Sequence, residues 1–222
     1  MTTKVAFIGL LVSLCVITVQ SFIGFLLRPS VFRRAMATSP PSSALCMEQA
    51  AVSGPVMGTE SIMSKKDHGT CTRPVSENLR WGVDVKTADR ICCFNRHYAE
   101  YSSYFWRKTK FVEYCQENAS KGPVKFFDPV SQKLLFTAPI GRTMDQFIAE
   151  SKSHGWPSFR DAEVNWDQVR VLPDGETVSL AGTHLGHNLP DSKGNRYCIN
   201  LVSVAGTGET EGESSNVQAS EE

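Results

Sequence analysis

Short runs of alternating and β-branched hydrophobic residues fill the second half of the chain. Residues 123–139, PVKFFDPVSQKLLFTAP, contain two such runs around the turn-forming residues Asp128 and Ser131, which predicts a β-hairpin. Three further runs follow, at 168–173 (QVRVLP), 176–182 (ETVSLAG) and 196–204 (RYCINLVSV). DG and SKGN turns separate them, so the pattern predicts a mainly antiparallel β domain.

Helical patterns are short. Residues 143–155, TMDQFIAESKSHG, predict one helix with Thr143 as its N-cap and Gly155 at its end. Residues 65–106 are dense in aromatic and charged side chains, and only their second half has a weak helical pattern. We therefore expect a few short helices beside the strands.

The N-terminal region has the composition of a targeting segment. Residues 4–22 hold one lysine and then a long apolar run, as a secretory signal peptide does. Residues 28–47 are rich in Arg, Ser, Ala and Pro, and no acidic residue precedes Glu48, as in a transit peptide. Together they resemble the bipartite presequences of algae with complex plastids, so we expect plastid localisation. Secretion or membrane anchoring is the alternative, because the apolar residues 23–27 could lengthen the run.

These patterns divide the chain into three parts. Residues 1–64 are expected to be a largely disordered targeting segment, and residues 65–206 form a domain of roughly 140 residues. Residues 207–222 are acidic and lack aromatic side chains, which predicts a disordered tail. The mature form is expected not to span a membrane.

Charge and cysteine content exclude several classes. The chain has 23 basic and 23 acidic residues, so its overall charge gives no reason to expect nucleic-acid binding. Its seven cysteines contain no C-x-x-C pair, which argues against a zinc ribbon or a thioredoxin-type dithiol.

One cysteine has an unusual setting. In the predicted strand 196–204, Tyr197 and Ile199 point to one face while Arg196, Cys198 and Asn200 point to the other. The nearby cation favours a thiolate, the nucleophilic form of cysteine. An idle, packed cysteine is the alternative, and position alone favours catalysis only weakly.

Two other motifs carry potential chemistry. HLGH places His184 and His187 three residues apart, as metal ligands or as hydrogen-bond donors and acids. A metal needs further ligands that the neighbouring residues do not supply, so we expect no metal site. Trp156 stands between Gly155 and Pro157, either as a core side chain or as a flat apolar wall for a methyl group.

In this order and spacing, GWPSF (155–159), HLGH (184–187) and RYCIN (196–200) resemble the signature blocks of the B-type methionine sulfoxide reductases. The resemblance extends from Lys133 to Val204, and is looser for HGTCTRP upstream. It implies two antiparallel β-sheets in a tent-like (Mss4-like) arrangement. It also implies thiol-dependent reduction of peptide-bound methionine (R)-sulfoxide.

The resemblance assigns roles residue by residue. Cys198 corresponds to the nucleophile, which becomes a sulfenic acid. His184 and His187 correspond to the pair that bind or protonate the sulfoxide oxygen. Asn200 and Arg196 order the site and favour the thiolate. The substrate-binding residues are Trp156 and Phe159.

The chain departs from that family in four places. Many members hold a structural zinc with two C-x-x-C pairs; here these positions are Asp128, Ser131, Val178 and Ala181, so we expect no zinc. His154 stands where many members have the resolving cysteine. The loop at 188–195 is shorter than usual, and residues 79–115 form an insert whose role is either an extra binding surface or a cover for the site.

The partners follow from this chemistry. Cys71, Cys92, Cys93 and Cys115 are the candidate internal resolving thiols; otherwise an external reductant such as thioredoxin or glutaredoxin attacks directly. We expect no bound cofactor, oxidised proteins or peptides as substrates, and a monomer. A non-catalytic binding module on the same fold and a reductase of another small sulfoxide are the alternatives.

Overall fold

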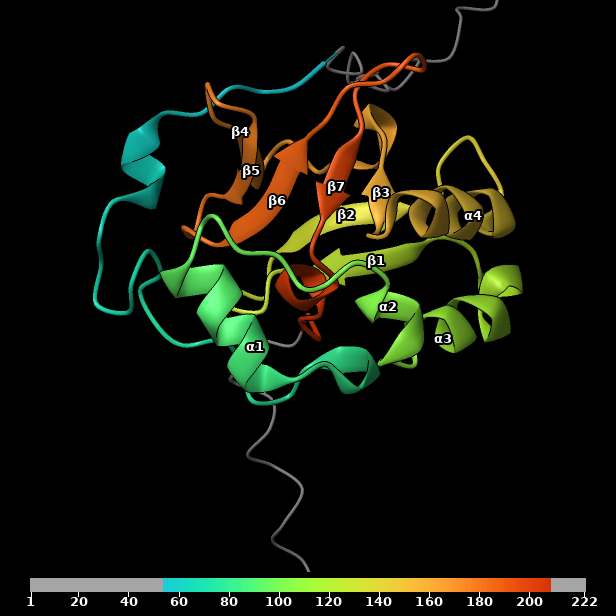
Figure 1. The fold of residues 1–222 in the computed structure, drawn as a ribbon, viewed down its shortest axis with the longest axis horizontal. Coiled ribbons are helices and arrows are strands. Elements are labelled where there is room, and N and C mark those ends of the chain that lie inside the picture. Colours follow the sequence, from blue (N-terminus) through green and yellow to red (C-terminus); the bar gives the residue numbers. More distant parts are fainter. Residues whose placement is uncertain (1–53, 209–222) are drawn as a thin grey trace, which may run out of the picture. The chain divides into compact units, whose positions relative to one another are not determined.

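The computed structural model describes residues 54–208. In this part of the chain, strands form two antiparallel sheets accompanied by short helices, which confirms the predicted mainly β fold (Figure 1). The described residues include no helix long and apolar enough to cross a membrane. The predicted signal and transit segments, and the acidic tail beyond residue 208, lie outside the described residues, so localisation stays a prediction.

The first sheet is the predicted hairpin. β1 (Val124–Phe127) pairs antiparallel with β2 (Leu134–Ala138). At the turn between them, the Asp128 carboxylate accepts a hydrogen bond from the backbone N–H of Val130 at 2.8 Å. This local bond is the reason that an aspartate favours a turn here.

The second sheet has five strands in the order β3-β7-β6-β5-β4. The strands are β3 (Ser158–Phe159), β4 (Val169–Val171), β5 (Glu176–Ser179), β6 (His184–Asn188) and β7 (Tyr197–Ile199). The strand predicted over 196–204 is therefore shorter than expected. Leu201–Val204 forms a 3-10 turn, because the backbone N–H groups of Leu201 and Val202 donate to the Glu100 carboxylate instead of to a strand.

The longest helix matches its prediction. α4 (Met144–His154) begins at Thr143, whose hydroxyl accepts from the Gln146 N–H while the Gln146 side chain accepts from the Thr143 N–H. This reciprocal pair is a capping box. Gly155 ends the helix in the left-handed conformation at φ 94°, which a glycine adopts without strain.

The predicted insert forms the remaining helices. α1 (Val85–Asp89) continues into a π-helical turn (Arg90–Phe94), and α2 (Tyr104–Arg107) and α3 (Phe111–Glu117) follow. Between the π-helical turn and α2, an irregular segment at residues 95–103 carries no helix or strand. Short 3-10 turns complete the structure, at Glu60–Met63, Arg80–Gly82, Ala119–Lys121 and Asp161–Glu163.

Aromatic side chains fill the core between the two sheets. Phe136 of β2 stacks on Phe159 of β3 with ring centroids 4.3 Å apart, and Phe126 and Phe147 pack around them. Phe159 is fully buried, so the structure corrects its assignment as a substrate-binding residue. Its ring packs into the aromatic core between the two sheets instead of lining the pocket.

The folded domain begins earlier than residue 65. Met57 bridges to Val171 beside β4, and the Gly58 N–H donates to the Val171 carbonyl at 2.8 Å. Met63 is buried against Leu172 and Val178. Residues 54–64 therefore pack on the second sheet as an ordered part of the domain. This corrects the boundary at 64/65 that we had expected.

Candidate active site

A bulge in β6 places both histidines of the HLGH motif on one face of the sheet. Residues three apart in a regular strand face opposite sides. Here Thr177 pairs with Gly186 and Val178 with His184, so Leu185 is an extra residue that reverses the alternation. His184 and His187 consequently lie side by side, with ring centroids 5.6 Å apart.

Cys198 lies beside them on the neighbouring strand. In the pairing of β6 with β7, His187 stands directly opposite Cys198, so both side chains leave the same face. Gly186 permits this close pairing, because a Cβ added at residue 186 would lie 2.1 Å from the Cys198 carbonyl oxygen. Cys198 and Asn200 both line the same pocket, as the alternation in the sequence predicted.

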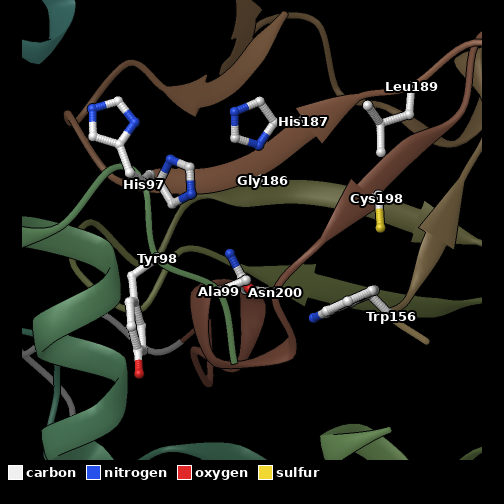
Figure 2. A pocket seen from close by; sticks show the side chains of 10 residues that line it. His97, Tyr98, Ala99, Trp156, Gly186, His187, Leu189, Cys198 and Asn200 are labelled. Atoms are coloured by element: carbon white, nitrogen blue, oxygen red, sulfur yellow. The ribbon is translucent and has the colours of Figure 1, made fainter. Parts of the chain in front are cut away.

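These side chains line a pocket of about 270 Å³ (Figure 2). One side, here named the sheet wall, comes from β6, β7, the residue that follows each of them, and a tryptophan two residues before β3; its members are Trp156, His184, Gly186, His187, Leu189, Cys198 and Asn200. The other side, named the loop wall, is formed by His97, Tyr98 and Ala99 of the irregular segment. The pocket has room for a side-chain-sized group.

The insert therefore covers part of the site. Sequence reasoning left open whether residues 79–115 add a binding surface or a cover, and the loop wall identifies residues 97–99 as lining the pocket. In Figure 2, His97 and Tyr98 face the pocket from the side away from Cys198 and Trp156. No periodicity or motif in NRHYAEYS (95–102) indicated this position.

Burial and charge act in opposite directions on the Cys198 thiol. Burial raises its pKa, and this effect exceeds the lowering by the charge and hydrogen bond of Arg196; Glu100 raises it further. The net result is a pKa above the ordinary value, so the thiol form is favoured at neutral pH. The sequence correctly indicated the direction of the Arg196 effect but not the larger effect of burial.

Arg196 acts from behind the pocket. Its side chain is buried and absent from the pocket lining, and its Nε lies 3.4 Å from an Asp191 carboxylate oxygen. Asp191 also accepts hydrogen bonds from Arg160 at 3.0 and 2.8 Å. The ion pairs hold the shortened 188–195 loop against the strand that carries Cys198.

A buried carboxylate orients His184. Glu176 Oε1 lies 2.6 Å from His184 Nδ1, and Arg96 holds the other oxygen through its Nε at 3.0 Å. Burial raises the pKa of Glu176, but the bonds from His184 and Arg96 together outweigh it, so the group is a carboxylate. With Nδ1 engaged, His184 has Nε2 free for the pocket.

His187 is held in the neutral form. Burial lowers its pKa, the neighbouring His184 lowers it further, and Glu176 only partly opposes this. A neutral imidazole opposite a protonated thiol can accept a proton and then pass it on.

Glu100 is a site residue that sequence reasoning missed. Its backbone carbonyl accepts from the Trp156 indole at 2.9 Å, and its N–H donates to the Asn200 side chain at 3.2 Å. Its carboxylate accepts from Leu201 and Val202 at 2.9 and 3.1 Å. Burial raises its pKa to about 7, against the opposing effect of those two bonds. One residue thus positions both Trp156 and Asn200.

The candidate resolving thiols lie in the interior. Cys71, Cys92, Cys93 and Cys115 are all free and buried, and none lines the pocket. Internal resolution through any of them requires the domain to open.

Asp128, which the sequence comparison above set against a zinc ligand, is hydrogen-bonded within the protein. The Thr183 hydroxyl lies 2.9 and 3.1 Å from the two oxygens of the buried Asp128 carboxylate. These bonds join the turn after β1 to the turn before β6.

A half-buried thiol, two histidines and a tryptophan around one small pocket define a site suited to thiol chemistry on a small polar group. Comparison with known proteins agrees with this class. The chain is 41% identical over 66 residues to the peptide methionine sulfoxide reductase MsrB of Methanosarcina mazei, covering 25% of this chain and 46% of the relative. It is also 41% identical over 69 residues to the protein of the same name from Methanosarcina barkeri, covering 26% and 48%.

The chain thus spans about half the length of these curated relatives. No protein-family model and no solved structure matches it.

Proposed function

We propose that this protein reduces peptide-bound methionine (R)-sulfoxide to methionine with Cys198 as the nucleophile. The observation that carries the proposal is the single pocket shared by Cys198, His184, His187 and Trp156. The similarity to the two Methanosarcina MsrB proteins supports the same reaction class.

The chemistry has two stages. The Cys198 sulfur attacks the sulfoxide sulfur, and the sulfoxide oxygen is protonated. The substrate's S–O bond then breaks as the hydroxyl is transferred to the Cys198 sulfur, so that the thioether leaves as methionine and Cys198 becomes a sulfenic acid. Two external thiols then reduce the sulfenic acid, releasing water and one disulfide. The sulfoxide is reduced and the external dithiol is oxidised.

Because the pKa of Cys198 is raised, the reaction needs a base. A thiol that is protonated in the resting state must lose its proton as it attacks. Neutral His187, directly opposite in the sheet, accepts that proton and then donates it to the sulfoxide oxygen. His184, fixed by Glu176, orients the oxygen.

Substrate selection follows from the pocket's apolar surfaces. The Trp156 indole, anchored through its N–H to Glu100, packs on the substrate's methyl group. Leu189 of the shortened loop lines the same pocket and supplies a second apolar contact. We propose that these two surfaces select the epimer.

The electron donor follows from the buried cysteines. Because the four candidate resolving thiols are in the core, an external thioredoxin-like or glutaredoxin-like reductant attacks the sulfenic acid directly. The protein needs no redox cofactor. Nor is zinc needed at the family's position, where Asp128 and Thr183 already join the two turns. Protein repair in a plastid, by a monomer, is the setting we propose.

Turnover of separated epimers tests the proposal. The full chain is incubated with the R or S epimer of dabsylated methionine sulfoxide and dithiothreitol. We expect turnover of the R epimer alone, and a loss of at least about 1000-fold in Cys198→Ser. The matched control Cys115→Ser, a buried cysteine outside the pocket, retains activity. Absence of turnover with both epimers would leave the binding-module alternative; turnover only of other small sulfoxides would favour the third alternative.

A further inference from the structure

Three side chains that commonly bind metals meet away from the pocket, and a further cysteine, Cys71, lies beside them. His68 and Cys71 come from a tight turn, and Asp89 and Cys93 from the end of α1 and its π-helical turn. The ligand atoms of His68, Asp89 and Cys93 all lie within 4.8 Å of one another. The Cys71 sulfur lies 3.7 and 3.6 Å from the carbonyl oxygens of Cys92 and Gly182. None of these residues belongs to the Cys198 pocket.

The backbone fixes this convergence. His68 and Cys71 exchange both backbone hydrogen bonds, at 2.9 and 3.0 Å, so their side chains leave the same face of the turn. Asp89 and Cys93 are about one helical turn apart and therefore also share a face. The Thr70 N–H donates to the Cys93 carbonyl at 2.8 Å and joins the two segments. A Cβ added at Gly69 would lie 1.9 Å from that carbonyl oxygen, so only glycine allows the approach.

The ligand set has the chemistry of a zinc site. One imidazole nitrogen, one carboxylate oxygen and two sulfurs provide the four ligands of a tetrahedral structural site. His68 Nε2 already lies 2.8 and 2.9 Å from the two Asp89 oxygens. A divalent cation binds cysteines as thiolates and releases their protons.

The cluster is accessible from the surface. The His68 and Asp89 side chains are 25% and 26% exposed and line a surface depression, whereas both thiols are buried behind them. An ion can therefore reach the sulfurs past the imidazole and carboxylate.

A second group of potential ligands lacks these features. Glu150, His154 and Asp191 also lie close together, but they include no thiol, and both carboxylates are hydrogen-bonded to Arg160.

We propose that His68, Cys71, Asp89 and Cys93 bind one zinc ion. All four positions come from the protein, so the site is structural and fastens the N-terminal turn to the insert that carries the loop wall. It lies on different residues from the family's zinc position and replaces our expectation that the chain has no metal site. Two of the four buried thiols are then metal ligands and are withdrawn from redox chemistry.

Metal binding by the full chain tests this proposal. The reduced protein is dialysed with Zn²⁺ and its metal content measured; Co²⁺ substitution then reports thiolate ligands through a sulfur-to-cobalt charge-transfer band. We expect one zinc per chain and this band. Cys93→Ser and His68→Ala should each weaken zinc binding at least about 100-fold, more than loss of an outer-shell contact does.

Two controls separate the site from the fold and from the proposed reaction. Cys92→Ser changes the equally buried neighbour of Cys93 and should retain zinc. Cys198→Ser should lose reductase activity and also retain zinc. His68 is partly exposed, so His68→Ala keeps the proposal testable if Cys93→Ser fails to fold.

Three results would overturn the proposal. In the first, the wild type holds no stoichiometric metal and shows no cobalt band. In the second, the purified protein contains a Cys71–Cys93 disulfide, and in the third, His68→Ala keeps full zinc affinity.

Discussion

The two walls of the Cys198 pocket are built by different means. The sheet wall stands on strands whose backbones are paired in register, so its side chains are placed by β-sheet geometry. The loop wall is an irregular segment held mainly by single contacts, above all those of Glu100. The difference teaches that the reactive groups are fixed by regular secondary structure, whereas the shape of the pocket opening depends on one buried residue within the irregular segment, Glu100.

The largest expected effect concerns the close approach of β6 and β7. Gly186→Ala places a Cβ 2.1 Å from the Cys198 carbonyl oxygen and must separate the two strands. We expect a loss of at least about 4 kcal/mol in the free energy of unfolding, measured by urea denaturation.

Gly194→Ala is the matched control for this prediction. Gly194 also has a positive φ, but an added Cβ there meets open space. Gly194→Ala should lower the free energy of unfolding only by the backbone strain of a non-glycine residue at positive φ, about 1–2 kcal/mol. Equal losses in the two variants would contradict the role given to the sheet wall.

The second prediction concerns Glu100, which supports the loop wall. Its pKa is raised from 4.5 to about 7 by burial. The folded state therefore binds this proton more tightly than the unfolded state, and stability falls as the pH rises from about 4.5 to about 7. The contribution lost is about 3 kcal/mol.

Unfolding free energies at pH 5 and pH 8 isolate this contribution. The glutamine of Glu100→Gln cannot ionise. The difference in unfolding free energy between wild type and variant should therefore change by about 3 kcal/mol between the two pH values. Glu117→Gln, at an exposed position at the end of α3, should behave as the wild type. If the unfolding free energies of Glu100→Gln and wild type changed in parallel with pH, the raised pKa of Glu100 would be refuted.

A third prediction concerns the orientation of His184 in the sheet wall. Glu176→Gln replaces the carboxylate that accepts from His184 Nδ1, so the imidazole loses its fixed tautomer. We expect kcat/KM for the R epimer to fall about 10- to 100-fold, as for other residues that orient a catalytic histidine. Glu60→Gln, at the exposed outer end of the same ion-pair chain, should change kcat/KM little.

The smallest effect belongs to the loop wall itself. Tyr98 lines the pocket, is about half exposed and packs under the Arg90 guanidinium at 4.2 Å. Tyr98→Ala should raise KM for a peptide substrate about fivefold, or about 1 kcal/mol, and leave kcat unchanged. A fall in kcat with constant KM would place Tyr98 in the reaction rather than in substrate contact.

The difference between regular strands and an irregular loop also explains what could be predicted from the sequence. The hairpin, α4 with its caps and the shared face of Cys198 and Asn200 depend on local patterns, and these expectations were confirmed. The bulge at Leu185 is invisible to period-2 reasoning, yet it brings His184 to the side of His187.

Long-range contacts explain the residues that were missed or misplaced. Glu100 is placed by bonds to residues about 100 positions away, and no motif surrounds it. The His68 and Cys93 cluster likewise joins two segments that each contribute only half of a ligand set. Phe159 was misassigned because it belongs to the same motif as Trp156, which lines the pocket, whereas the Phe159 ring is buried in the core three residues further on.

Trapping the intermediate on Cys198 tests the central claim most directly. The full chain is mixed with a peptide carrying methionine (R)-sulfoxide, without reductant, in the presence of dimedone, and is then digested for mass spectrometry. We predict one dimedone adduct on Cys198 and one equivalent of methionine, with neither formed from the S epimer. Reduction of the R epimer with the adduct on another cysteine, or adducts of equal yield from both epimers, would contradict the account.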